Sequence, residues 1–205
     1  MAATVRVPTE NTLRRIRRIQ AITIIWMSVE AGVSLSAAWI ARSPALLAFG
    51  GDSMIELLSA AVVLWRFGSR AVQESTERRA SRIAGALLFV LAIFVVGASG
   101  LTLLGHGEPQ PTYLGIVILV AAASIMPWLA KEKRRLSSAT GSASLRADSA
   151  QSALCGYLSL IALVGLGLNA IWHITWADPL AALVVVPLIV WEGREAIRGK
   201  PCGCC

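Results

Sequence analysis

The sequence predicts an all-α membrane protein built as a bundle of six transmembrane helices. Of its 205 residues, 56% are hydrophobic and only 15% are charged, and the mean hydropathy of +0.66 is far from that of a soluble domain. A helix needs about 20 apolar residues to cross the hydrocarbon core of a bilayer. Stretches of that length cover residues 19–40, 45–65, 83–104, 113–130, 147–171 and 179–197. None of them alternates with period two, as the strands of a membrane β-barrel would.

The first four predicted helices differ in the polar residues they carry. The first has Glu30 at its midpoint, and the second contains FGGDSMIELLSA, which places Asp52 and Glu56 inside an apolar stretch. The third contains GASG at 97–100, whose small residues favour either close helix packing or a dimer face. The fourth ends near Trp128, where an aromatic belt would meet the membrane interface.

The last two predicted helices also contain polar residues. The fifth carries Gln151 and Cys155 near its middle, with Asp148 almost one turn earlier. The sixth begins after Asp178 and Pro179, a pair typical of a helix N-cap followed by proline at the first helical position. We therefore expect Asp178 to start this helix rather than to bind a ligand.

The basic residues predict how the chain lies in the membrane. All but one of the 19 Lys and Arg precede the first helix, follow the second or fourth, or flank the last; the exception is Arg42. By the positive-inside rule, both termini are expected in the cytoplasm, with a bacterial plasma (inner) membrane as the location. Runs such as KEKRR are then anchors for anionic lipid, so the bilayer, and no nucleic acid, is the expected partner.

The intramembrane acids are the main functional signal. An ionisable side chain at the centre of a spanning helix costs roughly 2.5 to 3.5 kcal/mol on insertion scales and usually marks a pathway or site. Asp52 and Glu56 are four residues apart, so they share one helix face. A like-charged pair is unfavourable unless protons or a cation neutralise it. The pair therefore favours a cation site over protonated residues that only hold helices together.

The fifth helix offers an opposite wall for this site. A shift of 99 residues aligns 43–56 with its first half, so that Asp52 and Glu56 coincide with Gln151 and Cys155. The aligned pairs also include Ser43 with Ser142 and Ser53 with Ser152. Because the second and fifth helices run in opposite directions through the membrane, this pattern fits an inverted repeat with a site near the midplane.

At these segments the sequence resembles the cation diffusion facilitator (cation efflux) family of divalent-metal exporters. The run SLSAAWIARSPALLAFGGDSMIELLSAAVVL is similar to the first and second helices of that family, with a Ser-x-ALLA pattern leading into D-x-x-x-D, where this sequence has Glu56 in the last place. The run from SLRADSAQ to EGREAIRG is similar to its fifth and sixth helices, including RAD, the WADP turn and the E-G-x-x-A-[IL]-R ending.

The resemblance implies a proton-coupled exporter with a tetrahedral metal site between helices 2 and 5. Asp52 and Glu56 match the two acidic ligands of helix 2. Gln151 stands where the family usually has His, and Cys155 stands where it usually has Asp. Two carboxylates, an amide oxygen and a thiolate would still suit four-coordinate Zn²⁺. The thiolate favours soft ions, so we expect Zn²⁺ first, Cd²⁺ close behind, and hard ions such as Mn²⁺ disfavoured, as transported substrates with no prosthetic group.

Family members commonly continue into a soluble metal-binding domain, which we do not expect here. The predicted organisation is a basic cytoplasmic N-terminal segment at 1–18, a six-helix transmembrane cation efflux domain at 19–198 and a Cys-rich cytoplasmic tail at 199–205. The tail thiols would face a reducing compartment, which favours metal capture over disulfides. These thiols belong to Cys202, Cys204 and Cys205.

The sequence leaves alternatives open for the roles of two further acids and for the function of the protein. Glu30 is predicted as an extra proton carrier, a remote ligand or a protonated structural residue, and Asp148 as a guide for cations or a partner of Arg146. Metal ligands must lose their protons, which gives exchange of metal for protons a physical basis. The sequence favours a secondary transporter over an enzyme, because no paired nucleophile and base motif is present, and we expect a homodimer. A membrane-bound metal sensor or buffer without transport is the alternative.

Overall fold

The computed structural model describes residues 10–68 and 74–198, which form six α-helices. Their bounds are α1 Glu10–Ala41, α2 Pro44–Gly68, α3 Glu74–Leu103, α4 Tyr113–Thr140, α5 Ala143–Trp172 and α6 Ala177–Arg198. Within the described residues, α1 to α5 are long and apolar enough to cross a membrane. The shorter α6 is not among them, since acidic and basic residues interrupt its second half. The predicted all-α membrane bundle of six helices is confirmed.

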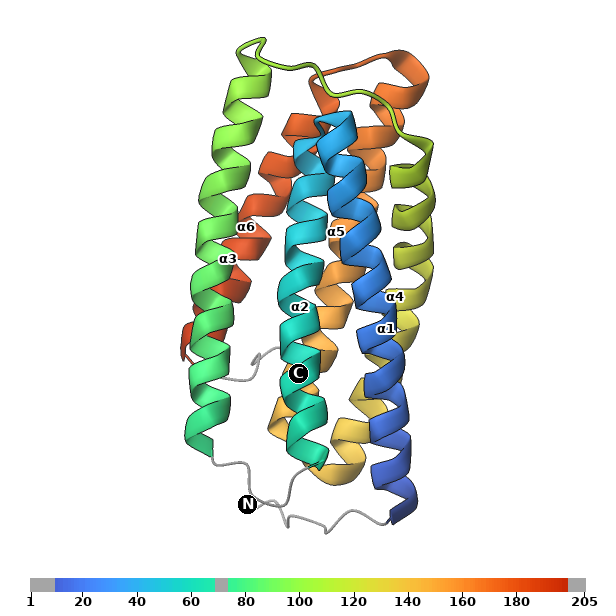
Figure 1. The fold of residues 1–205 in the computed structure, drawn as a ribbon, viewed down its shortest axis with the longest axis vertical. Coiled ribbons are helices and arrows are strands. Elements are labelled where there is room, and N and C mark those ends of the chain that lie inside the picture. Colours follow the sequence, from blue (N-terminus) through green and yellow to red (C-terminus); the bar gives the residue numbers. More distant parts are fainter. Residues whose placement is uncertain (1–9, 69–73, 199–205) are drawn as a thin grey trace.

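The helices stand side by side and alternate in direction along the long axis of the molecule (Figure 1). The most extensive contacts pair α4 with α5, α1 with α2, and α3 with α6. The second helix contacts α5 and α6 as well as its neighbours in sequence, so it occupies the middle of the bundle. We call the end where α1 begins and α2 ends the basic end, and the other the opposite end.

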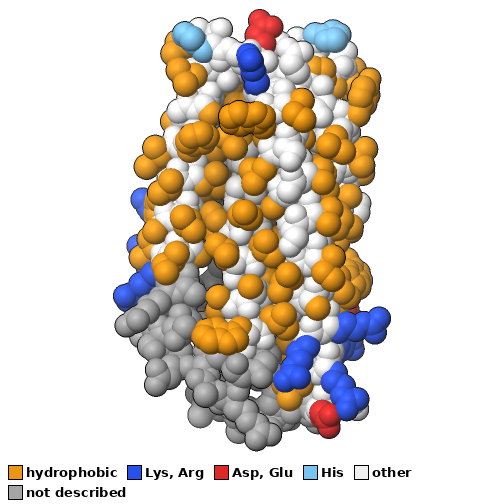
Figure 2. Space-filling model, in the orientation of Figure 1, with side chains coloured by type: hydrophobic (Ala, Val, Ile, Leu, Met, Phe, Trp, Pro, Cys, Tyr) orange, Lys and Arg blue, Asp and Glu red, His pale blue; other side chains and the backbone are white. Residues whose placement is uncertain are grey.

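Side-chain chemistry separates the two ends and the middle. Hydrophobic side chains cover most of the height of the face in Figure 2, Lys and Arg gather toward its lower, basic end, and His lies at the opposite end. Many large apolar side chains are exposed on α3, including Ile93 at 75% and Phe94 at 62%. Such a belt would be unstable in water and suits contact with lipid.

Three helices extend well beyond the stretches that hydropathy marks. The first and third begin at Glu10 and Glu74, each nine residues before the predicted start, and the fourth continues from residue 130 to Thr140. The extension of α4 ends at Gly141, which has a positive φ of 66° and closes the helix in the left-handed conformation. The segment KEKRR therefore belongs to a helix, and its side chains do not all face the same environment.

Glycine brings α6 close to α3 and α5. A Cβ at Gly85 of α3 would lie 2.7 Å from the carbonyl oxygen of Gly193 on α6. At Gly165 of α5 it would overlap the Cβ of Ala181. The GASG glycines of α3, in contrast, have nothing within 4 Å of such a Cβ. Among the described residues the two glycines therefore make no close contact, whereas Ser99 between them is 0% exposed, and both interpretations of GASG stay predictions.

Asp178 caps a different helix from the one expected. The sixth helix already includes Ala177, so Asp178 is not its N-cap. Instead, its carboxylate accepts hydrogen bonds from the hydroxyl of Ser43 at 2.5 Å and from the backbone N–H of Ala45 at 3.2 Å, at the start of α2. The expected structural role of Asp178 fits, but the prediction that it caps α6 was wrong. Because α6 starts beside the N-terminus of α2, Asp178 accepts hydrogen bonds from the unpaired donors of α2 instead.

Asp178→Ala is expected to lower the free energy of unfolding by about 1 to 3 kcal/mol, because it leaves buried donors at the start of α2 without an acceptor. Thermal unfolding of the purified protein in detergent measures this loss. The matched control is Glu108→Ala, which removes an exposed acid at the same end. Equal stability of the two variants would contradict the capping role.

Candidate functional site

Six acids and a single lysine are buried among the described residues of the bundle. Asp178 is at the opposite end, whereas the others lie deeper along the helices. These others are Glu30, Asp52, Glu56, Asp148, Glu192 and Lys133. Buried charges are costly unless they are paired or neutralised. One lysine against five acids leaves an excess of negative charge that further cations or protons must offset.

Glu30 links α1 to the two helices that carry the predicted ligands. Its Oε1 accepts a hydrogen bond from the hydroxyl of Ser53 on α2 at 2.7 Å and from the thiol of Cys155 on α5 at 3.3 Å. Glu30 and Cys155 are both 0% exposed. The structure therefore places Cys155 in contact with Glu30, for which the sequence left three roles open. Both lie beside Ser53, the residue that follows Asp52.

Glu56 lies in a second polar cluster that joins α2, α4 and α5. Its Oε1 accepts a hydrogen bond from Ser152 at 2.6 Å, and the ammonium of Lys133 lies 3.8 Å away. Lys133 also donates to the hydroxyl of Ser152 at 2.7 Å and forms an ion pair with Asp148 at 3.1 Å. Gln20 of α1 donates to the same Asp148 oxygen at 2.7 Å. This cluster lies on the basic-end side of Asp52.

Asp148 and Lys133 both depart from the sequence interpretation. The ion-pair partner of Asp148 is Lys133, while Arg146 is exposed. Lys133 is 0% exposed, so it is not the lipid anchor that the KEKRR run predicted. The reason is helical geometry: the extended α4 turns Lys133 toward α5 and leaves Lys131 on the outside.

Asp52 faces the acids of its own helix and its neighbours. Its charged neighbours are Glu192 of α6, Glu56 of α2 and Glu30 of α1. Glu192 in turn interacts with the side chain of Gln151 on α5. Gln151 thus lies on the α6 side of α5, and Glu192, which the sequence interpretation left out, joins the group of acids around Asp52.

Three buried carboxylates each leave one oxygen without a hydrogen-bond partner in the described part of the chain. These atoms are Oε2 of Glu30, Oε2 of Glu56 and Oδ1 of Asp148. Buried polar atoms are nearly always paired, so each exception needs an explanation. The three oxygens belong to α1, α2 and α5. The indole of Trp26 also interacts with Glu30, outside hydrogen-bond geometry for its N–H. Each oxygen can accept a proton or a cation without losing the contacts made by its other oxygen.

The four predicted ligands lie on packed helices, but they do not enclose a metal ion. Within 10–68 and 74–198, no three His, Cys, Asp or Glu side chains are placed to hold one together. Asp52 and Glu56 face Cys155 across the contact of α2 with α5, while Gln151 turns toward α6. A four-ligand arrangement would require these side chains to move together.

The aligned serines have equivalent roles in α2 and α5. Ser43 accepts a hydrogen bond from the N–H of Leu46, and Ser142 accepts one from the N–H of Leu145, three residues on in both cases. Ser53 and Ser152 each donate to a buried glutamate. The alignment of α2 with α5 at a shift of 99 residues could therefore have predicted these hydrogen-bonding serines, but the sequence interpretation did not use it.

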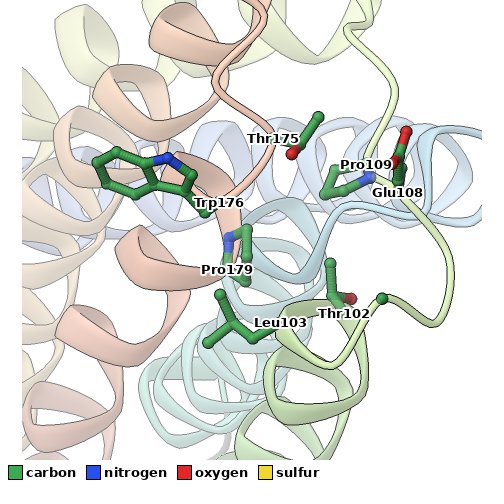
Figure 3. A pocket seen from close by; sticks show the side chains of 8 residues that line it. Thr102, Leu103, Glu108, Pro109, Thr175, Trp176 and Pro179 are labelled. Carbon is green, nitrogen blue, oxygen red and sulfur yellow. The ribbon is translucent and has the colours of Figure 1, made fainter.

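A pocket at the opposite end is separate from the buried acids. It has a volume of about 170 Å³ and lies between the end of α3, the following loop and the start of α6 (Figure 3). Glu108 is its one acidic residue, and none of the predicted ligands lines it. His106 and His173 are exposed in loops at this end, as solvated loop histidines would be. Cys202, Cys204 and Cys205 lie outside the described residues.

Comparisons with known proteins match most of the chain to one protein family. A family model described as the cation efflux transmembrane domain matches residues 21–199. A curated protein of Synechocystis sp., named uncharacterized transporter sll1263, is 28% identical over 176 residues. That match covers 82% of this chain and 57% of the relative, so the chain spans little more than half the length of the curated protein it matches.

Proposed function

Because the chain belongs to the cation efflux family, we propose that it exports divalent heavy-metal cations, Zn²⁺, Cd²⁺ or both, in exchange for protons. The cation would bind midway along the bundle between α2 and α5. The protein would thus be a secondary transporter and not an enzyme. The curated relative's name as a transporter supports this proposal.

The observation that carries the proposal is the set of unpaired carboxylate oxygens inside the bundle. Glu30, Glu56 and Asp148 each keep one oxygen free of hydrogen bonds among the described residues, and Asp52 interacts electrostatically with both glutamates. A purely structural polar network would be expected to satisfy its members. Unpaired carboxylate oxygens on several helices can bind a cation and release it again, and protons can replace the cation after release.

We assign the metal to Asp52, Glu56, Gln151 and Cys155, with Glu30 as the proton carrier or alternative ligand. Cys155 already contacts Glu30, and Ser152 next to Gln151 already contacts Glu56. When a cation arrives, the glutamates would exchange serine hydroxyls for the metal. Asp148 would guide the cation from the basic end, where it would enter.

The surroundings of the site follow from the same proposal. The basic end would face the cytoplasm of a bacterial cell, because the described Lys and Arg concentrate there while Arg42 lies at the other end. Residues 1–18 would be a basic N-terminal segment, 19–198 the transport domain and 199–205 a tail whose cysteines capture metal. A homodimer is expected, with the open surface of α3 at Gly97 and Gly100 as a contact.

Flux in proteoliposomes tests the proposal. The purified chain is reconstituted, and uptake of Zn²⁺, Cd²⁺ and Mn²⁺ is followed with and without an imposed proton gradient. The expected result is gradient-dependent uptake of Zn²⁺ and Cd²⁺ well above that of Mn²⁺. A membrane-bound sensor or buffer, the second candidate, would instead saturate in proportion to the amount of protein. Empty vesicles provide the background rate.

A further inference from the structure

Lys133 is a positive charge inside the proposed cation path, and nothing in the exporter proposal uses it. The side chain is 0% exposed and reaches from α4 to α2 and α5. Long basic side chains normally extend to water. Burying an ammonium this fully is favourable only where charged partners compensate the loss of hydration.

The partners of Lys133 connect the three helices around the basic-end side of the site. The ammonium lies 3.1 Å from Asp148 Oδ2 and 3.8 Å from Glu56 Oε1, and it donates to Ser152 at 2.7 Å. Ser152 donates in turn to Glu56. Gln20 adds α1 to the cluster through Asp148. This cluster lies between Glu56 and the basic end, the side from which the proposed cation would enter.

We propose that the Lys133 ammonium is an internal counter-cation that closes the basic-end approach to the acid pair and competes with the incoming metal for Glu56. This inference deepens the proposed export function and rests on it. The two ion pairs differ in length, because the Lys133 ammonium is closer to Asp148 than to Glu56. A divalent cation can therefore take Glu56 while Lys133 keeps its pair with Asp148.

Competition by Lys133 would set the balance between capture and release. With the ammonium beside Glu56, a divalent cation binds less tightly, because it must overcome a like charge and replace an existing contact. After the metal leaves, the ammonium neutralises Glu56 again. Removing it should strengthen metal binding and slow the turnover that depends on release.

The test compares Lys133→Met with the wild-type chain, both carrying Cys202→Ser, Cys204→Ser and Cys205→Ser to remove tail thiols. Zn²⁺ binding to the purified protein is titrated in detergent, and the concentration dependence of Zn²⁺ flux is measured in proteoliposomes. Lys133→Met is expected to bind Zn²⁺ about tenfold more tightly, equivalent to about 1.4 kcal/mol. Its KM for flux should fall and its maximal flux should fall with it.

Two further variants separate competition from stability. Lys133→Met with Asp148→Asn leaves no unpaired charge between these residues, so it should fold and should still bind Zn²⁺ more tightly than the wild type. Lys131→Met removes the same charge from an exposed position of the same helix and should leave both Kd and KM unchanged. An effect equal to that of Lys133→Met would mean that net charge alone is responsible, which would overturn the proposal.

The outcomes also distinguish this inference from the export function. If Asp52→Asn abolishes Zn²⁺ binding while both Lys133 variants bind as the wild type does, Lys133 does not compete and the inference is wrong, although the export function stands. If the wild type moves neither Zn²⁺ nor Cd²⁺, the export function itself fails. Failure of both Lys133 variants to fold would assign Lys133 to bundle stability and overturn the inference.

Discussion

Asp52→Asn and Glu56→Gln are each expected to reduce metal flux by at least about 100-fold while leaving the bundle folded. Each change removes a negative charge and replaces one of the two carboxylate oxygens with an amide nitrogen, which cannot bind a cation, without changing side-chain volume much. Mutation of residues that only support a metal ligand typically costs about 10- to 100-fold in affinity or activity. A lost ligand should cost at least the upper value. Zn²⁺ uptake in proteoliposomes measures the effect.

The control for these variants is Glu108→Gln, which changes an exposed acid at the opposite end in the same isosteric way. It should transport as the wild type does. Circular dichroism and elution volume establish that all three variants are folded. Wild-type flux in both site variants would leave the acid pair with a structural role and would refute the assignment of the site.

Cys155→Ser is expected to weaken Cd²⁺ binding by about 10- to 100-fold, and Zn²⁺ binding by less. A hydroxyl loses the charge and the softness of a thiolate, and these properties matter most for a large polarisable ion. Changing Gln151→His together with Cys155→Asp should shift the preference toward Zn²⁺. Competition between the two ions, measured on the purified proteins, gives the ratio directly.

The hydrogen bond from Cys155 to Glu30 provides a matched control. Serine keeps a donor at this position, whereas Cys155→Ala removes it. If Cys155 only supports Glu30, the serine variant should behave as the wild type and the alanine variant should not. If Cys155 is a ligand, the serine variant should already lose Cd²⁺. An unchanged ratio of the two ions in the serine variant and in the double variant would assign the fourth ligand elsewhere, with Glu30 the first candidate.

Hydropathy predicted the six helices well because the length of a membrane span is set by the bilayer. It could not predict the extension of α4 to Thr140, since a helix that leaves the apolar layer can continue through polar residues. Asp178 illustrates a related limit. Its sequence context favours an N-cap, but its carboxylate is used by α2, a contact that depends on where α6 begins in space.

The acid pair on α2 was predicted from its spacing and burial, and those properties are local. Lys133, Gln20 and Glu192 were not predicted, because each faces the interior only through the packing of another helix. Lys133 was hidden by its neighbours, since a run of basic residues normally indicates a solvated face. Its position three residues past the predicted span gave no sign that α4 would turn it inward.

The most direct test of a cation site at Asp52 and Glu56 is equilibrium binding of Zn²⁺ to the purified chain in which Cys202, Cys204 and Cys205 are serine. Comparison with the same chain carrying Asp52→Asn and Glu56→Gln isolates the intramembrane acids. We expect one site per chain in the first protein and its loss in the second. Equal binding by the two folded proteins would contradict a cation site at Asp52 and Glu56.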